Sequence, residues 1–140
     1  DGRRAQPRSR GRGDVYKRQT QTDPEPAAMD DDEEQALEVA TKMTTMYLGQ
    51  QPHIARASGV SEDVLGEVHD EMGGWPPRPG GLDAAMPLVP VEVVRSLTVA
   101  GTPEQCVAGA RAYETKPNIY PTLLPVTENY EQIVDVFAPA

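Results

Sequence analysis

The side chains able to do chemistry are few, and their spacing does not gather them into one motif. The two histidines, His53 and His69, are sixteen positions apart and belong to no H-E-x-x-H or Cys/His ligand pattern. The sequence therefore predicts no zinc site. His69 lies among Glu67, Asp70 and Glu71, a composition that predicts a solvated helix face more readily than a pair of catalytic carboxylates.

Three other side chains have both a chemical and a structural interpretation. His53 follows Pro52 in an uncharged stretch, and we favour a hydrogen-bonded structural histidine over a proton-transfer group. Trp75 stands in the Gly/Pro-rich loop 73–81, where it either lines a ligand site or covers its neighbours. Cys106 falls in the first turn of a predicted helix, where a thiolate can be favoured, but its place on the apolar stripe predicts a buried, inert thiol.

A position-based candidate comes from the carboxyl end of a predicted strand. Residues 119–126 form a short, nearly continuous apolar run, and in parallel α/β barrels active sites lie where the strands end. Here that end comprises Pro125, Val126, Thr127 and Glu128. A helix expected to begin near Asn129 would direct free N–H groups into the same region, which suits an anion or a phosphate.

The elements around that strand predict a parallel sheet. Thr102, Pro103 and Gln105 form a capping box with proline at the first helical position, and a closing apolar stripe follows over 130–137. A continuous apolar strand between two helices is typical of a sheet covered on both faces. One strand cannot make a sheet, so we expect this strand to lack both neighbours and most of the fold to lie outside these 140 residues.

Upstream, the pattern predicts a series of helices. The acidic run 30–34 stands where a helix dipole favours negative charge, and it lacks the spacing of a calcium-binding loop, so it predicts a solvated helix start and no metal site. Ser61 is expected to cap a second helix, the loop 73–81 to break the chain, and short helices to follow over 82–86 and 90–97. Residues 20–29 have no periodicity and are expected to be a linker or truncated loop.

Charge divides the chain unevenly. Residues 1–19 carry seven of the thirteen basic side chains and two acids, whereas the remainder carries six bases and twenty acids. The basic head is either a nucleic-acid-binding arm or, as we favour, a disordered sequencing-adapter artefact, because Asp14-Val15-Tyr16-Lys17-Arg18-Gln19 resembles a translated adapter. We therefore expect no nucleic-acid partner. Without an apolar run of about 20 residues we expect no membrane association, and the lone cysteine fits a reducing cytoplasm.

Several segments together resemble one known family. They are Tyr47–Gly49 with Pro52–Ala55, the Gly74–Pro76 loop, Val89–Val94, Gly101–Cys106 and Leu123–Val126. In this order and spacing they are similar to the C-terminal part of a luciferase-like monooxygenase, from the branch that uses flavin or the deazaflavin coenzyme F420. The "VP-x-E-x-V" helix followed by "GTPE-x-C" is the most specific element.

The resemblance implies that residues 30–140 are the C-terminal part of a (β/α)8 barrel, mostly helical here with one or two short strands. It implies an oxidoreductase that transfers hydride between reduced FMN or F420 and a small organic substrate, or a flavin-dependent monooxygenase, with a homo-oligomer as the expected assembly. No catalytic residue carries over, and the chain by itself is expected to be inactive. His53, Trp75 and the strand end 125–128 are the expected pocket wall. The alternative is a small acidic helical module that binds a protein partner through its apolar stripes.

Overall fold

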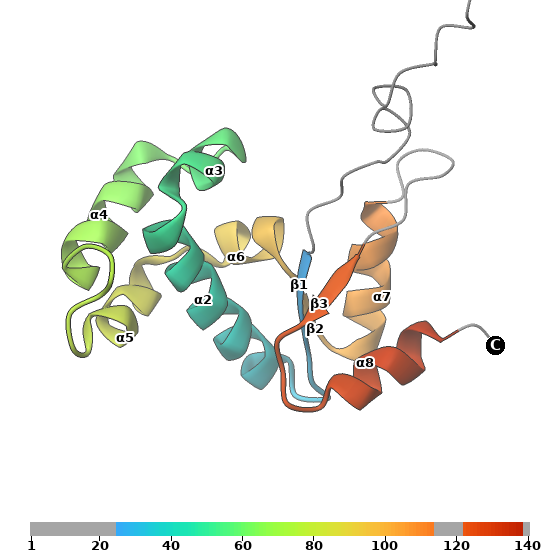
Figure 1. Cartoon of the computed structure of the whole chain (residues 1–140). Helices are drawn as coiled ribbons and strands as arrows, with labels where there is room; N and C mark the ends of the chain where they lie inside the picture. The colour runs from blue at the N-terminus through green and yellow to red at the C-terminus, as the bar shows by residue number, and fades with distance from the viewer. Residues whose placement is uncertain (1–24, 114–121, 139–140) are drawn as a thin grey trace, which may run out of the picture.

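The computed structural model describes residues 25–113 and 122–138, and a small parallel sheet lies at its centre (Figure 1). The strands are β1 (Glu25–Met29), β2 (Val99–Gly101) and β3 (Leu123–Pro125). β1 lies between the other two and runs parallel to both, so the strand order is β2-β1-β3. The described chain is therefore mixed α/β, mostly helical around a small parallel sheet, as the sequence predicted.

The central strand is the main departure from the sequence-based expectation. Residues 20–29 were expected to be a linker or loop; residues 20–24 lie outside the described part of the chain, and Glu25–Met29 is β1. Ala27, Ala28 and Met29 are at most 1% exposed. Alanine and proline are uncommon in strands, so this segment is held in the sheet by burial between helices and not by its own propensity.

Because β1 exists, β3 has one neighbour where none was expected. The pairing joins Pro26 to Leu124 and Ala27 to Pro125, and the N–H of Val126 donates to the carbonyl of Ala27 at 3.0 Å. Of the strand predicted over 119–126, residues 119–121 lie outside the described residues and Leu123–Pro125 is confirmed. The described sheet has three strands in place of one or two.

Helices fill the connection from β1 to β2. They are α2 (Glu33–Gln50), α3 (Pro52–Ala57), α4 (Glu62–Met72), α5 (Gly81–Ala85), the 3-10 helix η1 (Met86–Leu88) and α6 (Val91–Leu97). The predicted cap at Ser61 is present, because its hydroxyl accepts from the N–H of Val64. Within the predicted acidic start of α2, the Asp32 side chain also acts as a cap and accepts from the N–H of Glu34. α4 ends at Gly73, whose φ of +78° favours glycine.

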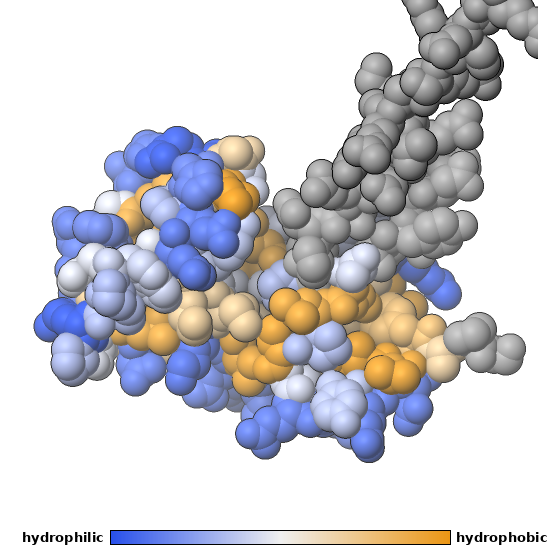
Figure 2. All heavy atoms as spheres, in the orientation of Figure 1, coloured by the Kyte–Doolittle hydropathy of each residue, from blue (hydrophilic) through white to orange (hydrophobic). Residues whose placement is uncertain are grey.

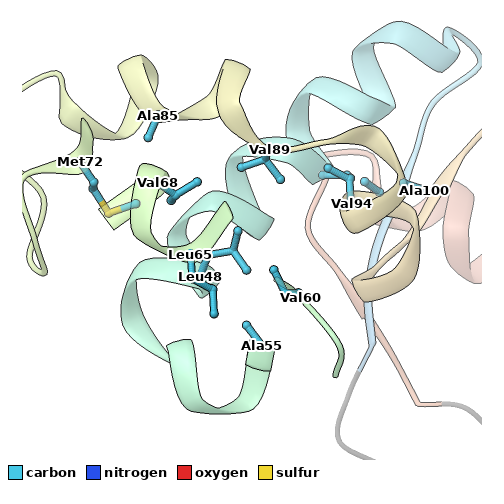
Figure 3. Close-up of a cluster of buried hydrophobic side chains, with 12 residues drawn as sticks. Leu48, Ala55, Val60, Leu65, Val68, Met72, Ala85, Val89, Val94 and Ala100 are labelled. Carbon is cyan, nitrogen blue, oxygen red and sulfur yellow. The ribbon is translucent and has the colours of Figure 1, made fainter. Parts of the chain in front are cut away.

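These helices enclose the larger hydrophobic core, here called the α2–α6 core (Figure 3). Its buried members are Ala28, Ala40, Leu48, Ala55, Val60, Leu65, Val68, Met72, Ala85, Val89, Val94 and Ala100. Figure 3 shows side chains contributed by α2, α3, α4, α5 and α6 and by the segments that lead into and out of α6. The helical unit therefore has an interior of its own, which joins one face of the sheet through two small residues.

Two further helices, α7 (Pro103–Ala112) and α8 (Tyr130–Phe137), lie against the other face. The capping box at Thr102 is confirmed: its hydroxyl accepts from the N–H of Gln105, and the Gln105 side chain accepts from the N–H of Thr102. This second cluster, the α7–α8 core, comprises the buried residues Ala27, Met29, Val99, Cys106 and Ile133. Successive strand residues point to opposite faces, so β1 alternates between the two cores. The prediction of a sheet covered on both faces is confirmed.

The outer side of β3 is less well covered. Leu124 is 49% exposed, and Tyr130 and Val134 of α8 are 56% and 58% exposed. Figure 2 shows apolar side chains gathered over this part of the molecule, with hydrophilic ones along the border below it.

Among the helices in the described residues, none has both the length and the hydropathy needed to cross a membrane.

Candidate functional site

The loops that follow the three strands meet at one edge of the sheet. Residues 30–32 follow β1, Thr102 follows β2, and residues 126–129 follow β3. Parallel strands bring these segments together because all three carboxyl ends face the same way. At this edge the N–H of Asp30 donates to the carbonyl of Gly101 at 3.2 Å. The sequence predicted a site at the end of one strand. In the structure that position is an edge formed by the ends of three strands.

Two side chains fasten the β3–α8 loop to the end of β1. The Asn129 Nδ2 donates to the carbonyl of Met29 at 3.0 Å and to Gln132 Oε1 at 2.7 Å. The Gln132 Nε2 in turn donates to Asp31 Oδ1 at 2.8 Å. Sequence reasoning took Asn129 for a helix start and did not single out Gln132. The only feature of the sequence that pointed to this contact was an asparagine ahead of an apolar helix. The partner of Asn129 on β1, the carbonyl of Met29, is brought to it by the fold.

Two oxygen atoms at this edge have no hydrogen-bond partner among the described residues. They are Thr127 Oγ1 and Asn129 Oδ1, and both atoms are buried although each residue as a whole is half-buried. A hydroxyl can donate or accept, and an amide oxygen accepts. The edge thus offers unused capacity for uncharged hydrogen bonds, and Thr127 is the one predicted pocket-wall residue with this property.

The charge at the edge is negative. A shallow depression of about 720 Å³ runs along the start of α8 and is lined by Glu128, Glu131 and Asp135 together with Asn129, Tyr130, Gln132 and Val136. The bond from Gln132 brings Asp31 close to the same surface. Carboxylates around a helix N-terminus disfavour a bound anion, because their charge opposes that of the ligand and exceeds the partial charge of the dipole. The start of α8 is thus poorly suited to the phosphate predicted for it.

The acidic run after β1 serves the helix that follows. Asp30 Oδ1 accepts from the N–H of Asp32, and Asp32 caps α2, with Glu33 and Glu34 in its first turn. Arg95 donates to Glu33 at 2.8 Å, and this bond lowers the pKa of the Glu33 carboxyl. The predicted solvated helix start is confirmed. Within the described ranges, no three His, Cys, Asp or Glu side chains are grouped to hold a metal ion.

The predicted pocket-wall residues divide between the two ends of α2. His53 is an exposed residue of α3, and Trp75 is 41% exposed beside Gly49, near the C-terminus of α2. The strand end lies by the N-terminus of α2, and a helix of 18 residues is about 27 Å long. The structure therefore does not bring His53 and Trp75 together with residues 125–128.

The strand-end residues themselves have different environments. Pro125 is exposed at the end of β3, and Glu128 is exposed on the rim of the acidic depression. The side chain of Val126 packs against the α2–α6 core, and its N–H donates to the carbonyl of Ala27 in β1. Val126 therefore stabilises the sheet and does not line the edge. Of these four residues, Thr127 alone has a buried side-chain oxygen without a hydrogen-bond partner among the described residues.

The structural interpretations of His69 and Cys106, as a solvated histidine and a buried thiol, are confirmed. His69 and Asp70 have side chains that are 60% and 89% exposed, and they lie 3.7 Å apart on a wet face of α4. Cys106 is fully buried, with Sγ 3.5 Å from the carbonyl oxygen of Gly101. Burial raises the pKa of this thiol to about 11, so it stays protonated and unreactive near neutral pH.

Comparisons with protein-family models, with curated proteins and with solved structures find no match to this chain.

Proposed function

We propose that this chain is part of a cytoplasmic α/β oxidoreductase related to the luciferase-like monooxygenases, acting on a small organic substrate with reduced flavin or F420. The observation that carries the proposal is the parallel β1–β3 pair joined through helices. It is supported by the resemblance, because its specific segments coincide with structural boundaries: Pro90 precedes α6, Thr102 caps α7, and Leu123–Pro125 is β3.

The proposal makes a demand on the topology. Successive strands of a (β/α)8 barrel are neighbours, so β1 and β3 would be successive barrel strands. β2 would then occupy the other edge of β1, where a closed barrel places the preceding strand, so a barrel would depart from sequential strand order at this point. The same order also occurs in doubly wound sheets, where ligands bind at the carboxyl ends near the point of strand reversal. Both architectures put the ligand at the edge described above.

The described residues at that edge do not fit the phosphate groups that FMN and F420 carry. The depression is lined by carboxylates, and Arg95 is already paired with Glu33. Thr127 and Asn129 instead offer uncharged hydrogen bonds. The proposal therefore gives this chain the role of shaping the uncharged part of a pocket, and it assigns no catalytic residue and no phosphate contact to it.

The test is to recover the longer open reading frame from the source DNA and to titrate its product with FMN and with F420, following the visible absorbance. We expect βα units upstream in the same frame, saturable binding of one of the two cofactors, and weaker substrate binding in Thr127→Val. A frame with no upstream βα units, or a product that binds neither cofactor, would overturn the proposal.

A second candidate, a small acidic module that binds a protein partner, is favoured by the exposed apolar side chains of Leu124, Tyr130 and Val134. In that case translation would begin near Met29. Met29 is the last residue of β1, however, so such a start removes most of the central strand. We expect residues 20–140 to unfold cooperatively and residues 29–140 to lose their near-ultraviolet circular dichroism. Equal stability of the two chains would favour the module.

A further inference from the structure

A second pocket, of about 210 Å³, lies at the opposite end of the sheet from the acidic edge. Pro26 at the start of β1 and Thr98 just before β2 contribute to it, which places it at the amino ends of the strands. Met43 and Thr44 of α2, Ile54 of α3 and Leu97 of α6 form much of its wall. No lining residue in the described part of the chain carries a formal charge, so the pocket suits an uncharged ligand.

Most aliphatic hydroxyl groups in the wall already donate to the backbone. Ser58 Oγ donates to the carbonyl of Ile54 at 3.0 Å, Ser96 Oγ to that of Val93 at 2.8 Å, and Thr98 Oγ1 to that of Val94 at 2.7 Å. These bonds follow from helical geometry, because a hydroxyl on a helix reaches the carbonyl three or four residues earlier. They leave these groups little need of a ligand.

Thr44 differs from the other threonines of its helix. Thr41 donates to the carbonyl of Leu37 and Thr45 to that of Thr41, each at 2.7 Å. Thr44 lines the pocket, is 1% exposed, and its Oγ1 has no partner among the described residues. A buried hydroxyl without a partner costs free energy, which a bound acceptor or donor would recover.

We propose that this pocket binds an uncharged ligand with one ring and a single carbonyl or hydroxyl oxygen, which pairs with the hydroxyl of Thr44. The volume sets the size, since an apolar cavity of about 150 Å³ accommodates benzene, and about 210 Å³ accommodates a ring with a short substituent. Thr44 lines the pocket and its Oγ1 has no partner among the described residues, so this hydroxyl is the one assigned to the ligand oxygen. Apolar contacts to Ile54 and Leu97 hold the ring.

The probe is acetophenone, a ketone with one ring, added to the full 140-residue chain labelled with ¹³C at its methionine methyl groups. Met43 lines the pocket, and Met86 in η1 does not, so Met86 is the internal reference. We expect a saturable shift of the Met43 methyl resonance with a dissociation constant on the order of 1 mM, given the ligand's few heavy atoms. A linear response shared by both methyl groups, or no response at Met43, would overturn the proposal.

Three variants separate the hydrogen bond from general packing. Thr44→Val keeps the shape and removes the hydroxyl, and we expect acetophenone affinity to fall about tenfold, the loss of one hydrogen bond. Thr45→Val is the matched control, because its hydroxyl bonds to the backbone and does not line the pocket. Ser96→Phe changes an exposed position at the rim and should abolish binding without unfolding the chain. Equal affinities in Thr44→Val and Thr45→Val would refute the role of Thr44.

Discussion

The two faces of the sheet are packed to different degrees. The α2–α6 core draws on five helical segments and encloses large side chains such as Met72, Leu65 and Leu48 at no more than 6% exposure. The α7–α8 core has five buried residues, and α8 leaves Tyr130 and Val134 more than half exposed. Stability is therefore concentrated in the helical unit, whereas β3 and α8, which form the acidic edge, belong to the less enclosed half.

This difference has a functional side. Segments with few buried apolar contacts open at lower free energy than the core, and binding sites are commonly drawn from them. The loop after β3 is held mainly by polar bonds, from Asn129 to Met29 and from Gln132 to Asp31. The pocket at the amino ends, in contrast, is built largely on helices that belong to the well-packed half. We expect the acidic edge to rearrange more readily than that pocket.

The largest expected effect tests the packing difference itself. Met72 is 0% exposed and Val134 is 58% exposed. Met72→Ala should lower the free energy of unfolding by about 2–5 kcal/mol, because it removes buried methylene groups and leaves a cavity. Val134→Ala should change it by less than about 0.5 kcal/mol. Urea unfolding followed by circular dichroism measures both, and similar losses in the two variants would contradict the comparison.

The next effect concerns Cys106, which packs in the α7–α8 core. Burial raises the pKa of its thiol from 9.0 to about 11, so the folded state favours the protonated form. The protonated thiol therefore contributes to the free energy of unfolding in full below pH 9. As the pH rises through 11 this contribution is lost, and the total loss is about 2–3 kcal/mol.

Cys106→Ala should therefore lose less stability than the parent chain between pH 8 and pH 11. Thermal unfolding at a series of pH values isolates the thiol, because the other titrating groups are common to both chains. Parallel pH profiles would show that the thiolate is not excluded from the α7–α8 core.

A smaller effect compares matched caps in the two halves. Thr102 caps α7 and Ser61 caps α4, and each hydroxyl accepts one backbone N–H at the start of its helix. Replacing either by alanine should cost about 1 kcal/mol. Native-state hydrogen exchange should show the Thr102→Ala effect mainly in α7, through local opening, and the Ser61→Ala effect spread over the α2–α6 core. Exchange changes of the same extent in both variants would remove the distinction between the halves.

The smallest effects should have opposite signs. Thr44→Val removes a buried hydroxyl that has no partner among the described residues, so it should raise the free energy of unfolding by about 0.5–1 kcal/mol. Thr45→Val removes a hydroxyl bonded to the carbonyl of Thr41 and should lower it by a similar amount. Chemical denaturation without ligand measures both, and a loss of stability in Thr44→Val would mean that its hydroxyl has a partner.

Local signals in the sequence were sufficient for much of the secondary structure. The capping box at Thr102, the cap at Ser61 and the acidic start of α2 depend on residues within four positions of one another, and all three are present. The site was harder to predict, because its contacts are long-range: Asn129 bonds to Met29 and Gln132 to Asp31, each about one hundred positions away. His53 and Trp75 were wrongly grouped with the strand end because their distance from it also depends on the fold. They lie near the C-terminus of α2, whereas the strand end lies near its N-terminus.

The sequence by itself determined where several helices begin, that Leu123–Pro125 is a strand, and that Cys106 is buried. Each follows from short-range hydrogen bonding or from the spacing of apolar residues. Only the tertiary structure decided that Glu25–Met29 is the central strand, because its alanines and proline have low strand propensity and gain their stability from the helices on both faces. It alone also left the Thr44 hydroxyl in a pocket without a protein partner among the described residues.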